Sequence, residues 1–160
     1  MTLELDIQRA DNLPPTPDDA DFKQWVQSCL AAVAHAGNAE VSIRLTDTAE
    51  IHELNRQYRG KDQPTNVLSF PADLPEALDI PLLGDIVICA QVVEQEAKEQ
   101  QKTVISHWAH MTIHGMLHLL GYDHIDDDEA EIMEALETRI ITGMGFPPPY
   151  IDEEDNQEQR

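Results

Sequence analysis

The histidine-rich run 114–124 (HGMLHLLGYDH) places strict demands on how the chain folds. His114 and His118 are four residues apart, so on a helix their side chains lie on one face, about one turn apart. Gly121 then predicts the end of that helix, because glycine adopts the left-handed conformation without a steric penalty. The chain can turn there and bring His124 back toward the other two. The run therefore predicts a helix, a glycine turn and three imidazoles that converge on one point.

Three neutral imidazole nitrogens suit a zinc ion, which each can bind at about 2.0–2.1 Å. Three protein ligands also leave a coordination position open for water, which is typical of a catalytic zinc site. We therefore expect one zinc ion per chain, bound by His114, His118 and His124, although Ni²⁺ or copper also suits imidazole. Histidines that are only buried in a core are the alternative, and the spacing argues against it. His107 and His110 continue the same helix face, and we expect them beside the site or on the surface.

Gly115 distinguishes the run from a zinc-protease motif. A metzincin protease reads H-E-x-x-H-x-x-G-x-x-H, and its glutamate carries a proton from the metal-bound water to the leaving amine. Glycine cannot do this. A phosphodiester instead requires neutralised charge on the phosphate and an aligned attacking oxygen, either metal-activated water or an RNA 2′-hydroxyl. We expect Gly115 to lie beside the metal and to leave room for a phosphate.

Three further residues are candidates for the site. Arg59 stands directly before a glycine and a loop, where a side chain can face a cleft. Its planar guanidinium can bind phosphate oxygens by two parallel hydrogen bonds, so we expect a catalytic role in stabilising the phosphate. Asp85 and Asp123 are candidates for a distant base or for a group that orients a ligating histidine.

The rest of the chain predicts a single mixed α/β domain. Alternating apolar and polar residues indicate strands, and apolar residues at helical spacing with acidic or threonine caps indicate helices. We expect one metal-dependent hydrolase domain over 1–150 and an acidic disordered tail over 151–160. Strands are predicted at 2–8, 41–45, 66–71 and 84–90, helices at 18–36, 46–60, from about 91, at 103–120 and at 126–141, and loops at 12–18 and 73–83.

The charge of the chain bears on its partners. A net charge of −21 argues, taken alone, against nucleic acid, because binding to a phosphate backbone depends on Lys and Arg. The bases gather partly in 56–61 (RQYRGK), so a local basic site on an acidic body remains open. The sequence has no long apolar run and no signal-peptide pattern, so we expect no membrane partner. Cys29 and Cys89 form no C-x-x-C motif, which is typical of structural thiols in a reducing compartment, and we expect a cytoplasmic location.

Three blocks of the sequence carry a family resemblance. They are 114–124, 54–71 (LNRQYRGKDQPTNVLSFP) and 83–88 (LGDIVI), and the likeness extends from about Val41 to Phe146. Together these blocks resemble the YbeY family of bacterial zinc-dependent endoribonucleases. The resemblance implies a four-stranded mixed sheet packed with about five helices. It also implies zinc on His114, His118 and His124, and a functional Arg59.

The same resemblance implies a substrate and partners. It implies a single-strand-specific endoribonuclease that acts in ribosomal RNA maturation, at the 3′ end of 16S rRNA, and in ribosome quality control. RNA is then the substrate, and the ribosome or ribosomal proteins are partners.

Two other functions remain open on the sequence alone. One is a zinc metalloprotease-like hydrolase that lacks the usual glutamate and takes a carboxylate from elsewhere in the chain. The other is a non-catalytic, ribosome-associated assembly factor with a structural zinc. A casein assay with a chelator control would distinguish the first, and a fourth protein ligand to the metal would favour the second.

Overall fold

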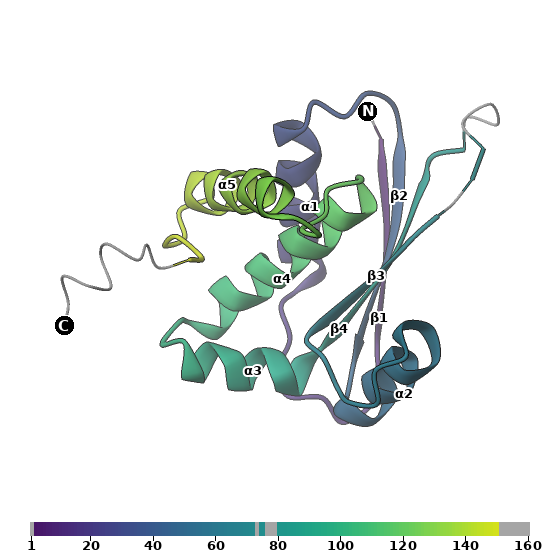
Figure 1. The fold of residues 1–160 in the computed structure, drawn as a ribbon, viewed down its shortest axis with the longest axis vertical. Coiled ribbons are helices and arrows are strands. Elements are labelled where there is room, and N and C mark those ends of the chain that lie inside the picture. The colour runs from purple at the N-terminus through teal and green to yellow at the C-terminus, as the bar shows by residue number, and fades with distance from the viewer. Residues whose placement is uncertain (1, 73, 76–79, 151–160) are drawn as a thin grey trace.

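The computed structural model describes residues 2–72, 74–75 and 80–150 (Figure 1). These residues form four strands and five helices in one α/β domain, which confirms the expected fold class and the mixed sheet. In chain order the elements are β1 (Leu3–Arg9), α1 (Asp19–Ala32), β2 (Ala39–Thr46), α2 (Thr48–Arg59), β3 (Val67–Pro71), β4 (Leu82–Cys89), α3 (Ala90–Glu99), α4 (Val104–Leu119) and α5 (Asp127–Gly143).

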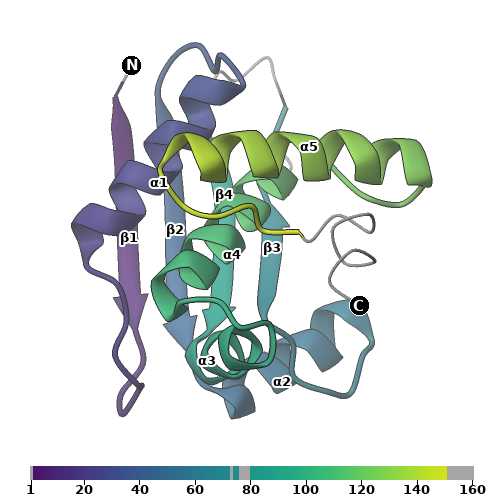
Figure 2. The same ribbon diagram turned by 90° about the vertical axis from the view of Figure 1, so that its left-hand side faces the viewer.

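The sheet has the strand order β1-β2-β4-β3 (Figure 2). β1, β2 and β4 are parallel, with Ile7 opposite Ile43 and Ile43 opposite Ile86. β3 is antiparallel to β4 and places Ser69 opposite Ile86. Because β3 is an edge strand, backbone groups on its outer side are free to bind side chains from elsewhere.

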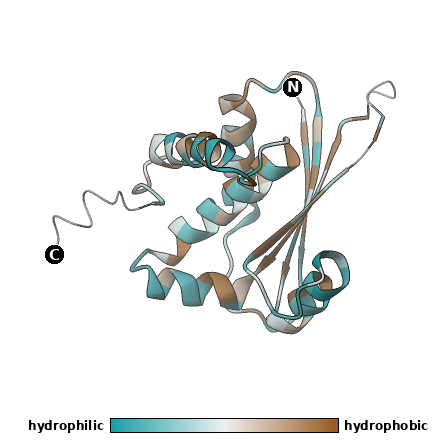
Figure 3. Cartoon of the chain, viewed as in Figure 1, coloured by the Kyte–Doolittle hydropathy of each residue, from teal (hydrophilic) through white to brown (hydrophobic). Residues whose placement is uncertain are grey.

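The two faces of the sheet are covered unequally. α1, α3, α4 and α5 lie on one face and α2 lies on the other (Figures 1 and 2). The larger apolar cluster lies under the four helices, and the strands that it covers are hydrophobic (Figure 3). α4 packs on β3 and β4 on one side and on α5 on the other, so it is buried over most of its surface. A smaller cluster under α2 contains Ile51, Leu68, Val87 and Cys89.

Most element boundaries lie within two residues of the sequence predictions, and α1 and β4 show the differences that can be explained. α1 ends at Ala32 rather than near residue 36, because Ala34 adopts a left-handed conformation with φ of 54° and the amide of His35 donates to the Leu30 carbonyl. β4 begins at Leu82, inside the segment expected to be a loop. Part of that loop and the expected tail at 151–160 lie outside the described residues.

Two further findings bear on the sequence predictions. Both cysteines are buried and unpaired, as expected for structural thiols. In the part of the chain that the structure describes, no helix combines the length and the apolar character needed to cross a membrane.

Candidate metal centre

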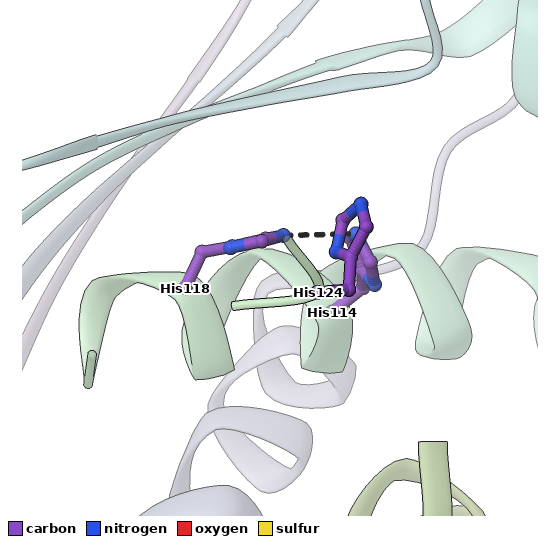
Figure 4. Close-up of side chains that lie close together, drawn as sticks. All are labelled: His114, His118 and His124. Atoms are coloured by element: carbon purple, nitrogen blue, oxygen red, sulfur yellow. Dashed lines mark hydrogen bonds between the residues drawn. The ribbon is translucent and has the colours of Figure 1, made fainter. Parts of the chain in front are cut away.

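α4 and the turn after it bring the three histidines together. Thr103 caps the start of the helix with a side chain that accepts a hydrogen bond from the Ser106 amide, and the last helical residue is Leu119. Gly121 follows with φ of 99°, in the left-handed region that glycine tolerates. Its amide donates to the His118 carbonyl over 3.1 Å. The predicted glycine turn is confirmed, and it returns His124 to the helix face (Figure 4).

The spacing of the imidazoles suits one metal ion. His114, His118 and His124 each offer a ring nitrogen, and these three atoms lie within 4.8 Å of one another. His114 Nε2 and His118 Nε2 are 3.1 Å apart (Figure 4). Two nitrogens bound tetrahedrally to one zinc ion at about 2.0–2.1 Å would lie about 3.3 Å apart. Among the described residues no fourth His, Cys, Asp or Glu joins this cluster, so the donor set fits an ion with an open coordination position.

Glu137 on α5 orients the first histidine. Its Oε1 accepts a hydrogen bond from His114 Nδ1 over 2.7 Å, and its Oε2 accepts one from His110 Nε2 over 2.8 Å. The Glu137 side chain is fully buried. An imidazole that donates from Nδ1 to a carboxylate keeps the lone pair of Nε2 for a metal. Glu137 therefore fixes the tautomer and the ring orientation of His114.

Sequence reasoning missed Glu137, although a signal was present. Met133, Ile140 and Ile141 form the buried side of α5, and Glu137 lies among them at helical spacing. A carboxylate on the apolar face of a helix needs a partner, because burial of an unpaired charge is costly. That pattern predicts a buried acceptor, but it does not say which donors it meets.

Hydrogen bonding controls the ionisation of this carboxylate. Burial by itself raises the pKa of Glu137, but the hydrogen bonds from His110, His114 and Tyr150 outweigh it and hold the pKa at about 2. Glu137 is therefore ionised at neutral pH. Burial, and then the neighbouring His114 and His124, lower the pKa of His118. A neutral His118 is the form that binds a metal.

His107 and His110 lie in a buried row that leads along α4 toward His114. Their residues are only 1% and 6% exposed, and His107 Nε2 donates to Glu96 Oε1 over 2.9 Å. The rings of His110 and His114 are perpendicular, with centroids 6.3 Å apart. Neither residue belongs to the cluster that can hold a metal, so both lie beside the site, with carboxylate partners of their own.

Arg59 faces the same cavity as the histidines. This cavity has a volume of about 550 Å³, and its lining includes Arg59, His114, His118 and His124. Arg59 is the last residue of α2, and its guanidinium donates to the Ser69 carbonyl on the edge strand over 2.8 Å. Two other arginines, Arg44 and Arg56, pair with carboxylates. Within the described residues Arg59 has no carboxylate partner, so its charge is directed to the cavity.

The two candidate aspartates occupy different places. Asp123 lines the cavity, and its Oδ1 accepts a hydrogen bond from the His124 amide over 2.8 Å, which holds the turn that carries this histidine. Asp85 is exposed on β4 and is not among the residues that line the cavity. The carboxylate that hydrogen-bonds the ring of a candidate metal ligand is Glu137.

The expected position of Gly115 was wrong. A Cβ atom at this position would lie 2.9 Å from Ile86 Cγ2 and 3.3 Å from Ser69 Oγ. Gly115 therefore faces β3 and β4 rather than the cavity. Its carbonyl accepts a hydrogen bond from Ser69 Oγ over 3.2 Å. The missing side chain lets α4 lie close against the sheet.

The fold and the site together define a small α/β protein with a three-histidine cluster, suited to a metal ion, on a helix and its glycine turn. The chain belongs to the YbeY family, described as Endoribonuclease YbeY, which matches residues 6–145. The chain is also similar to the solution structure of TM1509 from Thermotoga maritima. The two are 27% identical over 94% of this chain and 97% of that chain, with a TM-score of 0.59. The fold is thus shared over nearly the full length of both proteins.

Proposed function

We propose that the chain is a metal-dependent endoribonuclease that cuts single-stranded RNA in the cytoplasm. Ribosomal RNA is the proposed substrate, with roles in maturation of the 16S rRNA 3′ end and in ribosome quality control, where the ribosome or ribosomal proteins are partners. Membership of the YbeY family supports endoribonuclease activity. The observation that carries the proposed mechanism is the single cavity that the three histidines share with Arg59.

The proposed metal site consists of His114, His118 and His124, with one ion per chain. Zinc is the favoured ion because three neutral imidazoles suit it, and Ni²⁺ also suits the same donors. When bound, such an ion supplies a Lewis acid and lowers the pKa of a water molecule toward about 7. Glu137 contributes by holding His114 Nδ1–H, which leaves Nε2 of that ring for the ion.

Arg59 is proposed to bind the phosphate under attack. A guanidinium has five N–H donors, and one NH2 group of Arg59 is held by the Ser69 carbonyl. This contact fixes the side chain and leaves other donors for two parallel bonds to the non-bridging oxygens. Lys61 lines the same cavity, so the cavity carries local positive charge on a chain whose net charge is −21.

The carboxylates near the histidines favour phosphodiester over peptide cleavage. Gly115 faces the sheet, so a glutamate in the protease position would not reach the cavity. Glu137 already accepts hydrogen bonds from His110 and His114, which suits an orienting group rather than a general base. An amide leaving group depends strongly on protonation, whereas a phosphodiester depends on charge neutralisation, which Arg59 supplies.

The decisive experiment compares RNA cleavage by four forms of the protein on one single-stranded substrate. The metal-loaded parent and Arg56→Ala should cleave it, whereas metal-free protein and Arg59→Ala should not. Arg56 is the matched control, because it lies on the same helix and pairs with Glu53. A duplex of the same sequence should remain intact. Parent-like cleavage by Arg59→Ala would show that this arginine is not part of the reaction.

Two further substrates distinguish attack by water from attack by the 2′-hydroxyl, and a nuclease from a protease. A substrate with 2′-deoxy residues should still be cut if water attacks, and it should resist cleavage if the 2′-hydroxyl attacks. Chelator-sensitive cleavage of casein, without cleavage of RNA, would identify a protease instead.

A further inference from the structure

The segment that follows α5 returns to the back of the metal centre. This segment, residues 146–150, is called the strap below, and it runs beneath α5 and across α4 (Figure 2). Phe146 anchors its start against Trp25, with ring centroids 6.5 Å apart. Lys102 Nζ donates to the Pro149 carbonyl over 2.7 Å. Tyr150 then donates its hydroxyl to Glu137 Oε2 over 2.5 Å.

Tyr150 completes the hydrogen bonding of the buried carboxylate. Glu137 Oε2 receives the hydroxyl of Tyr150 and Nε2–H of His110, while Oε1 receives Nδ1–H of His114. The rings of Tyr150 and His110 are perpendicular, with centroids 5.2 Å apart. Tyr150 is itself 39% exposed, so it lies between solvent and a carboxylate that is fully buried.

The hydrogen bonds to Glu137 determine which nitrogen of His110 carries its proton. His110 Nδ1 is buried and has no hydrogen-bond partner among the described residues. The single proton of a neutral His110 is therefore best placed on Nε2, where it meets Glu137. Two donors on Oε2 hold that oxygen in place and turn Oε1 toward His114. Loss of the Tyr150 hydroxyl would leave one donor on Oε2 and would allow the carboxylate to rotate.

We propose that Tyr150 is a positioning residue of the metal centre. Its hydroxyl holds Glu137 in the orientation that receives His114 Nδ1–H, and His114 Nε2 is thereby kept free for the metal. The strap thus makes metal affinity depend on residues beyond the last helix. This inference rests on the proposed function only in that the three histidines bind a metal. Residue 150 lies outside the segment 6–145 that matches the family model.

The test measures zinc affinity by competition with a chelator, in the absence of RNA. Tyr150→Phe should bind zinc about 10-fold more weakly, at the lower end of the range for groups that support a metal ligand. The unfolding temperature of the metal-free protein should change little. Tyr58→Phe is the matched control, because it makes the same change in an exposed ring on α2, and it should bind zinc like the parent.

A second variant removes the hydrogen bond between Lys102 and the strap. Lys102→Met removes the contact with the Pro149 carbonyl and leaves the Tyr150 side chain unchanged. It should weaken zinc binding in the same direction. The double variant should lose less affinity than the product of the two single losses, because both act through one segment. In nitrogen NMR spectra, the Nδ1–H signal of His114 should broaden or shift in Tyr150→Phe.

Three outcomes would overturn the proposal. If Tyr150→Phe binds zinc as tightly as Tyr58→Phe, the strap does not position the site. If Tyr150→Phe lowers the unfolding temperature of the metal-free protein and leaves zinc affinity unchanged, its role is packing alone. If the parent protein itself binds no zinc, the metal site of the proposed function is wrong, and the role of Tyr150 is wrong with it. The first two outcomes overturn only the role of Tyr150, because the parent still binds zinc.

Discussion

Two adjacent residues of α4 face opposite environments. Gly115 lies against β3 and β4, where even a Cβ atom would meet Ile86 at 2.9 Å. His114 turns toward the cavity and α5, where its Nδ1 finds Glu137. One residue along an α-helix is a rotation of about 100°, so neighbours in a motif need not share a function. The comparison explains the missing protease glutamate: its position belongs to the packing side of the helix.

The two sides of α4 also make different kinds of contact. The sheet side depends on close approach, which any added side chain opposes. The side toward the cavity and α5 carries polar groups that pair with carboxylates: His107 donates to Glu96, and His110 donates to Glu137. Substitutions on the sheet side should therefore change stability, and those on the cavity side should change metal binding or catalysis. The predictions below test this division.

Gly115→Glu should have the largest effect of all. Overpacking costs about 1–3 kcal/mol, and an unpaired buried carboxylate costs several more, so unfolding should become easier by more than about 3 kcal/mol. Such a loss is a large part of the stability of an ordinary domain. Denaturant unfolding of the metal-free protein measures it. No protease activity should appear, because the glutamate would face the sheet.

Two variants serve as controls for that prediction. Gly143→Glu adds the same side chain at an exposed glycine of α5 with nothing within 4 Å, so stability should stay within about 1 kcal/mol of the parent. Gly115→Ala should fall between the two, since a helix-propensity gain of about 1 kcal/mol offsets part of the cost of the close contact with Ile86 Cγ2. A stable Gly115→Glu protein with bound zinc would remove the distinction between the two sides.

His118→Ala tests the cavity side through the metal. Two remaining ligands rarely hold zinc tightly, so the purified variant should lose most of its metal and its RNA cleavage. The fold should survive, because His118 is only half-buried and faces the cavity. Metal analysis and circular dichroism check the two halves of the prediction. His52→Ala is the control: His52 lies on α2 and pairs with Asp62, so this variant should keep its metal. Equal metal content in the His118→Ala and His52→Ala proteins would contradict the assigned ligands.

Much of the fold and of the candidate metal site could be predicted from the sequence. The spacing of His114, His118 and His124 and the glycine after the helix predicted the imidazole cluster, because both depend on local backbone geometry. Alternating and helical periodicity likewise predicted the strands and helices, apart from the end of α1 and the start of β4. These features depend on neighbours in the chain, and a single sequence displays them directly.

The features of the site that were missed depend on long-range packing. The contact between His114 and Glu137 joins residues 23 apart in the sequence, and it requires α5 to cross α4 at one register. The direction of Gly115 depends on which face of α4 the sheet covers, and the motif alone does not specify that face. Asp85 was plausible by residue type, but strand alternation in the folded sheet leaves it exposed and outside the cavity lining.

Glu137→Gln should reduce both zinc affinity and stability, the second in a pH-dependent way. Loss of a carboxylate that orients a metal ligand typically costs about 10–100-fold in affinity. The pKa of Glu137 is about 2 in the folded protein and 4.5 ordinarily. A lowered pKa means that the carboxylate stabilises the fold above about pH 4.5, on the order of 3 kcal/mol, and that this contribution is lost as the pH falls toward 2.

Denaturant unfolding of metal-free protein at several pH values checks the second part. The stability gap between the parent and Glu137→Gln should be full at pH 7 and should narrow between pH 4.5 and pH 2. Glu134→Gln, an exposed carboxylate one turn earlier on α5, should show no comparable gap. A gap that stays constant down to pH 2 would mean that the charge of Glu137 is not what stabilises this side of α4.

Arg59→Lys should leave the stability of the protein unchanged, and it tests whether the cavity side acts through geometry or through charge alone. Lysine keeps the positive charge but loses the planar fork, which donates to the Ser69 carbonyl and is proposed to bind two phosphate oxygens. RNA cleavage should fall by about 10²-fold, or about 2.7 kcal/mol of transition-state stabilisation, while zinc content and stability remain those of the parent. Arg56→Lys makes the same change three residues earlier and should cleave normally. If Arg59→Lys also cleaves like the parent, charge alone suffices in this cavity, and only the metal ligands on the cavity side of α4 require a fixed geometry.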